Sequence, residues 1–205
     1  MTIVVPRGAE ARAVRKGNPN AGIVEVAAGA RAAASLPQIP AGEAAVVLGL
    51  CGALRDLTVG DVVVYRRVAG DTAEVELDVG LRDELASSLG ATLVDAWTVD
   101  HVVTTVAERA ALAFGSAADV VDMEGIHLAA ALAARGVRFA MVRIVSDDAS
   151  RDLPALERAI RADGSIDVAR IAAAFVRSPR AAYAFSRDVR RALRRLGETS
   201  AVLSR

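Results

Sequence analysis

Short runs of β-branched residues alternate with alanine- and leucine-rich segments along most of the chain. The apolar runs begin with TIVV at residues 2–5 and end with FAMVRIVS at 139–146, and segments of helical period lie between them. Strands that alternate with helices are typical of an α/β fold whose sheet is largely parallel and covered by helices on both faces. This alternation therefore predicts an α/β fold for the chain.

Two glycines predict where helices end. Gly90 and Gly136 each follow an alanine-rich helical segment, where a left-handed C-terminal cap is expected.

The end of the chain has a helical pattern without strand-like runs. After Asp152 the strand-like runs stop, so we expect a single domain over residues 1–205 with a helical tail from about 152 to 205. The tail is predicted to hold three helices, at residues 153–161, 167–177 and 180–196.

Composition narrows the classes of function. The formal net charge is zero at pH 7, which removes the general attraction to nucleic acid that a basic domain has. Cys51 is the one cysteine, so no internal disulfide is expected, and His101 and His127 are too few and too far apart for an ordinary metal site. We therefore expect neither a metal nor a nucleic-acid partner.

The sequence predicts neither a membrane span nor a leader. No stretch approaches the roughly 18 uncharged apolar residues of a spanning helix. Met1 leads directly into TIVV, without the charged, apolar and small-residue regions of a secretory signal. We therefore expect a soluble, cytoplasmic protein.

In open α/β sheets, ligands bind beyond the carboxyl ends of the strands, and three such ends carry glycine or polar residues here. The first lies in VVLGLCGALRDLTVGDVVV, residues 46–64, where Gly49 and Gly52 predict a turn at which backbone amides approach an anion or a sugar. A tight loop that needs glycine only for its φ angles explains the pattern equally well. The dinucleotide motif G-x-G-x-x-G is absent.

The second strand end is VVDMEGIHLA, residues 120–129, in which Met123 lies between Asp122 and Glu124. A sugar would explain this arrangement, because its apolar face suits a thioether and its hydroxyls suit a carboxylate acceptor such as Glu124. The alternative is electrostatic, since acidic residues in a first helical turn interact favourably with the helix dipole and need no ligand. Taken without context, the residues favour this alternative.

The third strand end is FAMVRIVSDDA, residues 139–149, which delivers Ser146, Asp147 and Asp148 together. A desolvated carboxylic acid at this place would donate a proton to a leaving group, with Ser146 to orient it. A helix cap or a turn is a common alternative for such a run of residues.

Taken in order, LTVGDVVV after the glycines, VDMEG and VRIVSD resemble the nucleoside phosphorylase and nucleosidase superfamily over about residues 43–149. Its members include purine nucleoside phosphorylases and methylthioadenosine/adenosylhomocysteine nucleosidases. TVDHVVTTVAERAAL and the tail from RDLP onward resemble the hopanoid-associated phosphorylases, which are implicated in removing adenine from an adenosyl-hopane lipid intermediate. The resemblance implies a three-layer α/β fold with a central, mostly parallel mixed sheet flanked by helices and a C-terminal helical extension.

This resemblance implies cleavage of the N-glycosidic bond of an adenine-type purine nucleoside, and it assigns roles to residues. Asp147 would protonate the purine beside Ser146, while Glu124 would accept the ribose hydroxyls and Met123 would contact the sugar. The other implied contacts come from Cys51, Gly52 and Ala53 near the ribose and nucleophile, and from Val102 and Val103 at the base. A methylthioadenosine/adenosylhomocysteine-type nucleosidase and a nucleoside-binding protein without turnover are the alternatives. The resemblance also implies a homo-oligomer.

The acceptor of the ribosyl group stays open between water and phosphate. Hydrolytic members use a glutamate near the end of the first strand, and Glu10 lies near that place, although a first-turn acid of a helix is an equal explanation. Phosphorolytic members need arginine and hydroxyl or amide donors for phosphate. Leu50 stands where many members carry a phosphate-binding serine, and Arg7, Arg12 and Arg143 would have to compensate. No cofactor is expected, and phosphate is the one candidate co-substrate.

Structural roles are favoured for two further features. His101 near a strand end and His127 in an alanine-rich helix are more typical of satisfied polar residues than of ligands. The last predicted helix combines apolar residues at helical spacing with five arginines, a pattern that would suit peripheral contact with an anionic membrane and a lipid-linked nucleoside, although packing on its own domain is favoured. The apolar residues are Phe185, Val189, Leu193 and Leu196, and the arginines are Arg187, Arg190, Arg191, Arg194 and Arg195.

Overall fold

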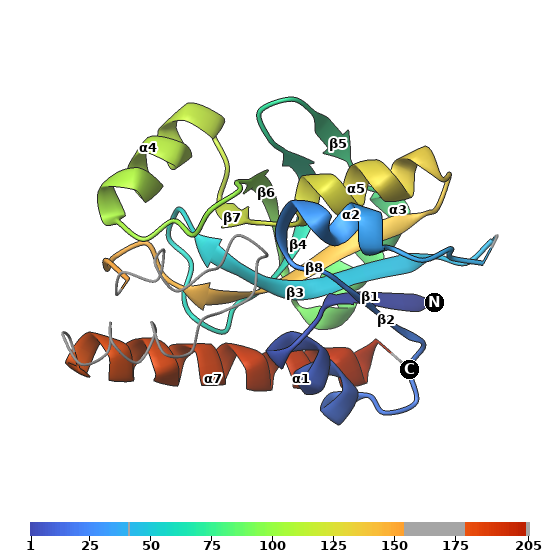
Figure 1. Cartoon of the computed structure of the whole chain (residues 1–205), viewed down its shortest axis with the longest axis horizontal. Helices are drawn as coiled ribbons and strands as arrows, with labels where there is room; N and C mark the ends of the chain where they lie inside the picture. The colour runs from blue at the N-terminus through green and yellow to red at the C-terminus, as the bar shows by residue number, and fades with distance from the viewer. Residues whose placement is uncertain (41, 154–178, 204–205) are drawn as a thin grey trace.

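The computed structural model describes residues 1–40, 42–153 and 179–203, with the side chains of residues 179–182 excepted. Strands and helices alternate along the first three quarters of the chain, and one long helix ends it (Figure 1). The elements are β1 (Thr2–Pro6), α1 (Ala9–Gly17), β2 (Ile23–Val26), the 3₁₀ turn η1 (Gly29–Arg31), α2 (Ala32–Ser35), β3 (Ala45–Ala53), β4 (Val62–Ala69), β5 (Glu74–Glu76), α3 (Val79–Leu89), β6 (Thr92–Thr98), α4 (Val106–Ser116), β7 (Val120–Asp122), α5 (Gly125–Ala134), β8 (Phe139–Asp147) and α7 (Pro179–Val202).

The strands form one mixed, mostly parallel sheet. Its order is β2-β1-β3-β7-β6-β4-β5, and β8 pairs with β3 in parallel and with β4 in antiparallel fashion. The pairings β3-β7-β6-β4-β8 return to β3, so these strands close into a ring. The carboxyl ends of β3 and β8 lie side by side, from the pair Ala45 and Phe139 up to the pair Gly52 and Asp147. This register brings two of the three predicted strand ends together.

Two apolar layers cover the faces of the sheet. Successive side chains of a strand point to opposite faces, and along β3 this places Val47 with α2 and α5, whereas Val46 and Leu48 face α1, α3 and α7. Figure 1 shows α2 and α5 above the sheet and α1 and α7 below it. Helices on both faces of a central mixed sheet confirm the predicted three-layer α/β fold.

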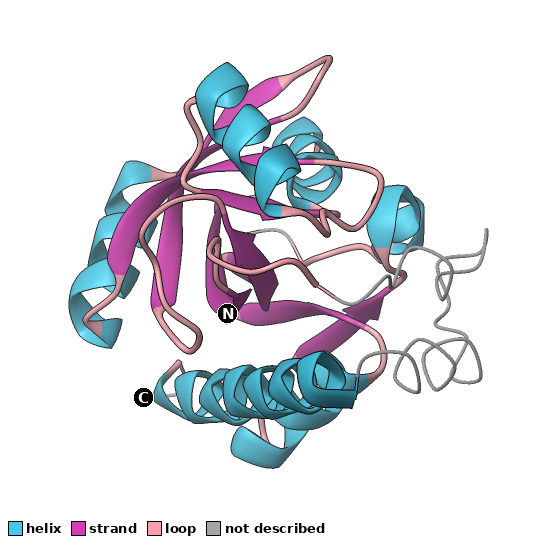
Figure 2. Cartoon of the chain, turned by 90° about the vertical axis from the view of Figure 1, so that its left-hand side faces the viewer, coloured by secondary structure: helices cyan, strands magenta, loops and turns pink. Residues whose placement is uncertain are grey.

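Helix α7 packs closely against α1. A Cβ atom on Gly17 would overlap the main chain of Gly197, so the two helices reach this distance only because both positions are glycine. Asn18 donates from Nδ2 to the carbonyl of Ser200 over 2.9 Å, and the Ser200 hydroxyl donates to the carbonyl of Val14. In Figure 2 the two helices lie together along one side of the sheet. The last helix is thus part of the packed domain.

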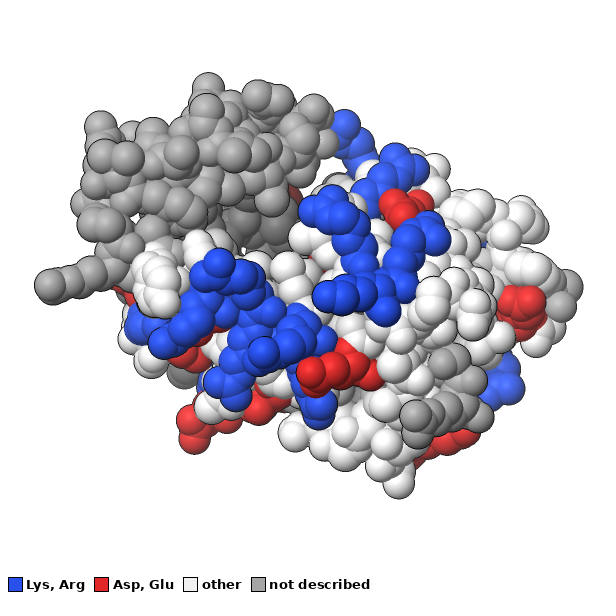
Figure 3. Space-filling model, turned by 90° about the horizontal axis from the view of Figure 1, so that it is seen from below, with Lys and Arg blue, Asp and Glu red and all other residues white. Residues whose placement is uncertain are grey.

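The predictions for the tail have different outcomes. The predicted helix at 180–196 lies within α7, whose Ala192 and Leu196 are fully buried in the core, which supports packing on its own domain. The five arginines are exposed. Seen from below, the surface carries groups of Lys and Arg side chains with several Asp and Glu side chains among them (Figure 3). Peripheral membrane contact stays a prediction. Within the described parts of the chain, no helix is long and apolar enough to cross a membrane. Except for Leu153, the predicted helices at 153–161 and 167–177 lie outside the described residues.

The predicted helix ends are confirmed. Gly90 ends α3 with φ of 59°, and Gly136 follows α5 with φ of 65°. Both values lie in the left-handed region that glycine adopts without steric penalty.

Candidate active site

A cavity of about 200 Å³ opens at the carboxyl ends of β3, β7 and β8. The start of α1 and the loop between β6 and α4 complete its wall. All three predicted strand ends therefore contribute to one site. The predicted site residues that line it are Glu10, Cys51, Gly52, Val102, Val103, Met123, Glu124, Ser146 and Asp147.

Glu10 reaches the cavity from the first turn of α1. Its Oε1 atom accepts a hydrogen bond from the backbone N–H of Leu50 over 2.7 Å, which fixes the carboxyl group against β3. Burial, followed by the negative charge of Glu124, raises the pKa of Glu10 from 4.5 to about 7. Glu10 is therefore more than a first-turn acid of a helix, because its carboxyl group faces another element and the cavity.

Glu124 and Asp122 have separate roles at the start of α5. The Glu124 carboxylate accepts from the backbone N–H of Gly29 over 2.8 Å, and burial raises its pKa. The amide of the first helical residue, Gly125, donates instead to Oδ1 of Asp122 over 3.0 Å. The helix terminus is thus satisfied by Asp122, and Glu124 stays directed at the cavity beside Met123.

Asp122 and Arg143 form a buried ion pair, in which Asp122 belongs to the cavity wall and Arg143 lies behind it. Nη2 of Arg143 lies 3.1 Å from Oδ2 of Asp122, and both side chains have at most 1% exposure. The hydroxyl groups of Tyr65 and Thr98 also donate to Asp122, over 3.1 Å and 2.7 Å. The prediction that Arg143 contacts substrate is wrong on this geometry, because Arg143 is fully buried and does not line the cavity. Its charge lies behind Glu10 and Glu124 and partly offsets theirs.

The two glycines of the first motif lie inside β3, so the predicted turn is wrong. A Cβ atom on Gly49 would overlap the guanidinium group of Arg143. A Cβ atom on Gly52 would lie 2.8 Å from Oδ2 of Asp147 and 3.1 Å from Nη1 of Arg109. The glycines are needed because charged side chains pass over the strand at these two positions.

Replacing Asp122 by asparagine is expected to destabilise the fold strongly. The change leaves Arg143 buried without its hydrogen-bonded counter-ion, which typically costs about 3–5 kcal/mol. Urea unfolding measures this loss. Glu74→Gln is the control, because Glu74 pairs with Arg67 on the surface with a side chain that is 51% exposed, and exposed pairs contribute about 1 kcal/mol or less. Equal losses in the two variants would contradict the assignment.

Asp147 ends β8 with both carboxylate oxygens engaged. Oδ1 lies 2.5 Å from the hydroxyl of Ser146, which also lies 3.1 Å from the carbonyl of Cys51. Oδ2 lies 2.6 Å from Nη2 of Arg109. The turn-forming alternative belongs to the next residue, because Asp148 accepts from the backbone N–H of Ser150 over 3.0 Å. Asp147 is left to face the cavity.

Sequence reasoning missed Arg109, which lines the cavity from α4. Its Nη1 and Nη2 atoms donate to the carbonyls of Ala53 and Val103, each over 2.9 Å. The prediction that Ala53 contacts the ligand is wrong, because Ala53 does not line the cavity. Its carbonyl instead accepts the hydrogen bond from Arg109. A signal existed in the sequence, since Arg109 shares one helical face with the partly buried Leu112 and Ala113.

The remaining candidates divide between the wall and the surface. His101 lines the cavity, and its ring nitrogens lie 2.9 Å from Asp100 and 2.7 Å from Glu108, whose hydrogen bonds raise the pKa of His101. It is thus a satisfied polar residue, as favoured. Arg7 and Arg12 are exposed and do not line the cavity, so the prediction that they compensate at a phosphate site is wrong.

Comparisons with solved structures show the same fold in known nucleosidases. A methylthioadenosine/adenosylhomocysteine nucleosidase mutant from Helicobacter pylori, with 5′-methylthioadenosine in its active site, has a TM-score of 0.64 at 15% identity and covers 99% of this chain and 95% of its own. Futalosine hydrolase from H. pylori gives 0.67 at 15% identity, with 99% and 94% covered. The nucleosidase from Campylobacter jejuni gives 0.62 at 16% identity, with 92% and 98% covered.

No curated protein matches the chain. The family model described as the phosphorylase superfamily matches residues 8–177, which is most of the chain. The chain therefore belongs to the phosphorylase superfamily, and it is an enzyme of the nucleoside phosphorylase and nucleosidase class, as the order of its motifs predicted.

Proposed function

We propose that the chain hydrolyses the N-glycosidic bond of an adenine-type nucleoside and releases the free base. The observation that carries this proposal is the position of Glu10, a carboxyl group with a pKa of about 7 in the same cavity as Asp147 and Glu124. A general base works best when its pKa lies near the operating pH. Glu10 is thus suited to take a proton from water at neutral pH.

In the proposed reaction, the C1′–N9 bond breaks and its electron pair goes to the purine. Asp147 gives its proton to N7 of the departing base, with Ser146 beside it, and the ribosyl ring takes on positive charge. Glu124 accepts hydrogen bonds from the ribose hydroxyls, and Met123 contacts the apolar face of the sugar. Glu10 removes a proton from the water that attacks C1′. Val102 and Val103 contact the base, and Cys51 and Gly52 lie near the ribose.

Water is favoured over phosphate by the charges that line the cavity. Among the described lining residues, Arg109 is the one arginine or lysine, and it is engaged with Asp147. The backbone amide of Leu50 donates to Glu10 and is not free for an anion. A phosphate ion needs charge-assisted hydrogen bonds to match its charge. The proposed enzyme therefore acts as a nucleosidase.

The substituent on C5′ is best probed with methylthioadenosine, because the H. pylori relative holds this nucleoside in its active site. The adenosyl-lipid substrate that the tail resembles stays a second candidate. Residues 154–178 of the resembling tail lie outside the described residues. Assembly into a homo-oligomer, a cytoplasmic location and the absence of a cofactor also stay predictions.

The function is tested by incubating the purified chain with adenosine, methylthioadenosine and an adenosine that carries a long apolar 5′ chain. Chromatography measures free adenine and identifies the sugar product, with and without phosphate. We expect adenine together with the free sugar in both buffers. Calorimetric binding of all three nucleosides without adenine release in either buffer would instead identify a nucleoside-binding protein. A sugar 1-phosphate product would identify a phosphorylase.

A further inference from the structure

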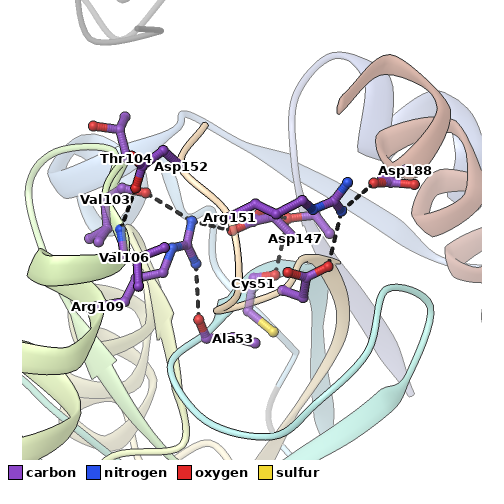
Figure 4. Close-up of polar contacts among 12 residues, drawn as sticks. Cys51, Ala53, Val103, Thr104, Val106, Arg109, Asp147, Arg151, Asp152 and Asp188 are labelled. Carbon is purple, nitrogen blue, oxygen red and sulfur yellow. Dashed lines mark hydrogen bonds and ion pairs between the residues drawn. The ribbon is translucent and has the colours of Figure 1, made fainter. Parts of the chain in front are cut away.

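Arg109 is a fully buried cation that joins three segments around the proposed acid. Its side chain is 1% exposed, and its guanidinium group contacts the carboxylate of Asp147 at the end of β8. It also donates to the carbonyl of Ala53 at the end of β3 and to that of Val103 before α4. Figure 4 shows Arg109 between these groups. The three segments are far apart in sequence and converge on this one side chain.

We infer that Arg109 is a positioning residue, which holds the Asp147 carboxylate and the Val102–Val103 segment in one fixed geometry. This inference rests on the proposed function, in which Asp147 transfers a proton to the base that Val102 and Val103 contact. Proton transfer depends steeply on the placement of the two atoms that share the proton. Arg109 acts on this step through Asp147.

The cost of burying the Arg109 guanidinium group explains why Asp147 keeps its observed position. Moving a guanidinium group out of water costs several kcal/mol unless a counter-ion and hydrogen bonds replace its hydration. Among the ion pairs of the described residues, Asp147 is the one carboxylate that pairs with Arg109. Rotating Asp147 away would leave Nη2 of the buried guanidinium group without its carboxyl oxygen partner, whether or not Asp147 carries the proton that it gives to the base. This contact therefore penalises any geometry of Asp147 other than the one observed.

Each carboxyl oxygen of Asp147 has its own partner. Arg109 takes Oδ2 at 2.6 Å, which leaves Oδ1 to the hydroxyl of Ser146 at 2.5 Å. With one partner on each oxygen, the plane of the carboxyl group is fixed. Val103 is fixed by the same guanidinium group, so the wall for the base and the acid keep a constant separation.

A double-mutant cycle separates positioning from a merely structural role. The four proteins are the wild type, Arg109→Met, Asp147→Asn and the double variant, and the readouts are kcat and KM for adenine release from methylthioadenosine. Residues that act through one another show non-additive effects. We expect Arg109→Met to lower kcat by about 30-fold or more in the wild type, but by less than about 3-fold once Asp147 is asparagine. KM should change by less than about 3-fold.

Two further variants secure the result. Arg55→Met is the matched control, because Arg55 binds the carbonyls of Ala113 and Ala118 at the other end of α4, away from Asp147. Its kcat should stay within about 3-fold of the wild type. Arg109→Lys retains the charge but cannot reach all three partners. If Arg109→Met does not fold, Arg109→Lys replaces it in the double-mutant cycle, and we expect it to lower kcat by about 10-fold.

The outcomes separate the inference from the function on which it rests. An equal fold-loss from the Arg109 variant in both backgrounds, or no loss in the wild type, would overturn the positioning role and leave the proposed function intact. Full turnover by Asp147→Asn would instead overturn the proposed acid, whatever the Arg109 variants do.

Discussion

Asp147→Asn is expected to lower kcat for adenine release by about 10²- to 10⁴-fold, the range that removal of a general acid usually produces. Asparagine has nearly the same shape and still accepts a hydrogen bond from Arg109, but it has no proton to give to N7. The change also removes the counter-ion of the buried Arg109, which typically costs about 3–5 kcal/mol, so kcat is compared at a temperature at which circular dichroism shows the variant folded. Binding of the nucleoside should therefore persist. Chromatographic assay of adenine gives kcat, and calorimetry with methylthioadenosine gives the affinity of the inactive variant.

The neighbouring residue supplies the control for this prediction. Asp148 lies one position further along, and its carboxylate binds Ser150 and Arg151 in the loop after β8. Asp148→Asn should keep kcat within about 3-fold of the wild type, since its contacts are exposed. If both variants lost turnover equally, the loop would be sensitive as a whole, and the special role of Asp147 would be wrong.

Glu10→Gln is expected to lower kcat/KM by at least about 10²-fold, because glutamine cannot take a proton from water. The amide oxygen still accepts from the backbone N–H of Leu50, so the local structure should persist. In the wild type the base must be ionised, and its pKa is about 7. The rate should therefore rise with pH and level off above pH 7, and this acid limb should be absent from the residual activity of Glu10→Gln.

The same substitution should stabilise the fold at alkaline pH. Burial raises the pKa of Glu10 from 4.5 in a model carboxyl group to about 7, so the folded state retains this proton over a range in which the unfolded chain has lost it. The wild type should accordingly lose stability relative to Glu10→Gln as pH rises from about 4.5 to about 7, by at most about 3 kcal/mol. Urea unfolding at pH 5 and pH 8 measures the difference.

The surface carboxylate of Glu25 provides the comparison for both readouts. Glu25 pairs with Arg15 on the surface, at 2.9 Å with an arginine side chain that is 55% exposed. Glu25→Gln should change neither the rate profile nor the difference in stability between the two pH values. A Glu10→Gln protein that gains more stability at pH 5 than at pH 8 would show that the carboxyl group is not buried as described.

The alternation of strand and helical patterns was enough to predict the fold, because both periods are local properties of the chain. Gly90 and Gly136 were predicted as helix ends for the same reason. The order of the strands was not predictable in this way. β8 pairs with both β3 and β4, and only the folded structure shows this closure.

Most of the cavity-lining residues followed from the three strand ends, because parallel strands β3 and β8 bring their carboxyl ends to one edge of the sheet. Long-range partners decided the exceptions. The sequence pattern suggested that Gly49 forms a turn. In the structure glycine is needed there because the guanidinium group of Arg143, from a strand more than 90 positions away, passes over this position. Arg143 looked like a ligand contact, but Asp122 holds it behind the cavity.

The roles of the two acidic residues on either side of Met123 also could not be distinguished from the sequence. Asp122 and Glu124 have equal charges in the sequence, and the helix-dipole explanation fitted both. In the structure the amide of Gly125 donates a hydrogen bond to Asp122, which also pairs with Arg143, whereas Glu124 lines the cavity. The helix-terminus explanation thus holds for Asp122, whereas the sugar-binding role of Glu124 stays a prediction.

The central claim is tested most directly by the initial rate of adenine release from methylthioadenosine as phosphate is raised from zero to about 10 mM. We predict release without phosphate, at a rate that added phosphate does not change, and with the free sugar as the second product. Release that requires phosphate, or no release at any phosphate concentration, would contradict it.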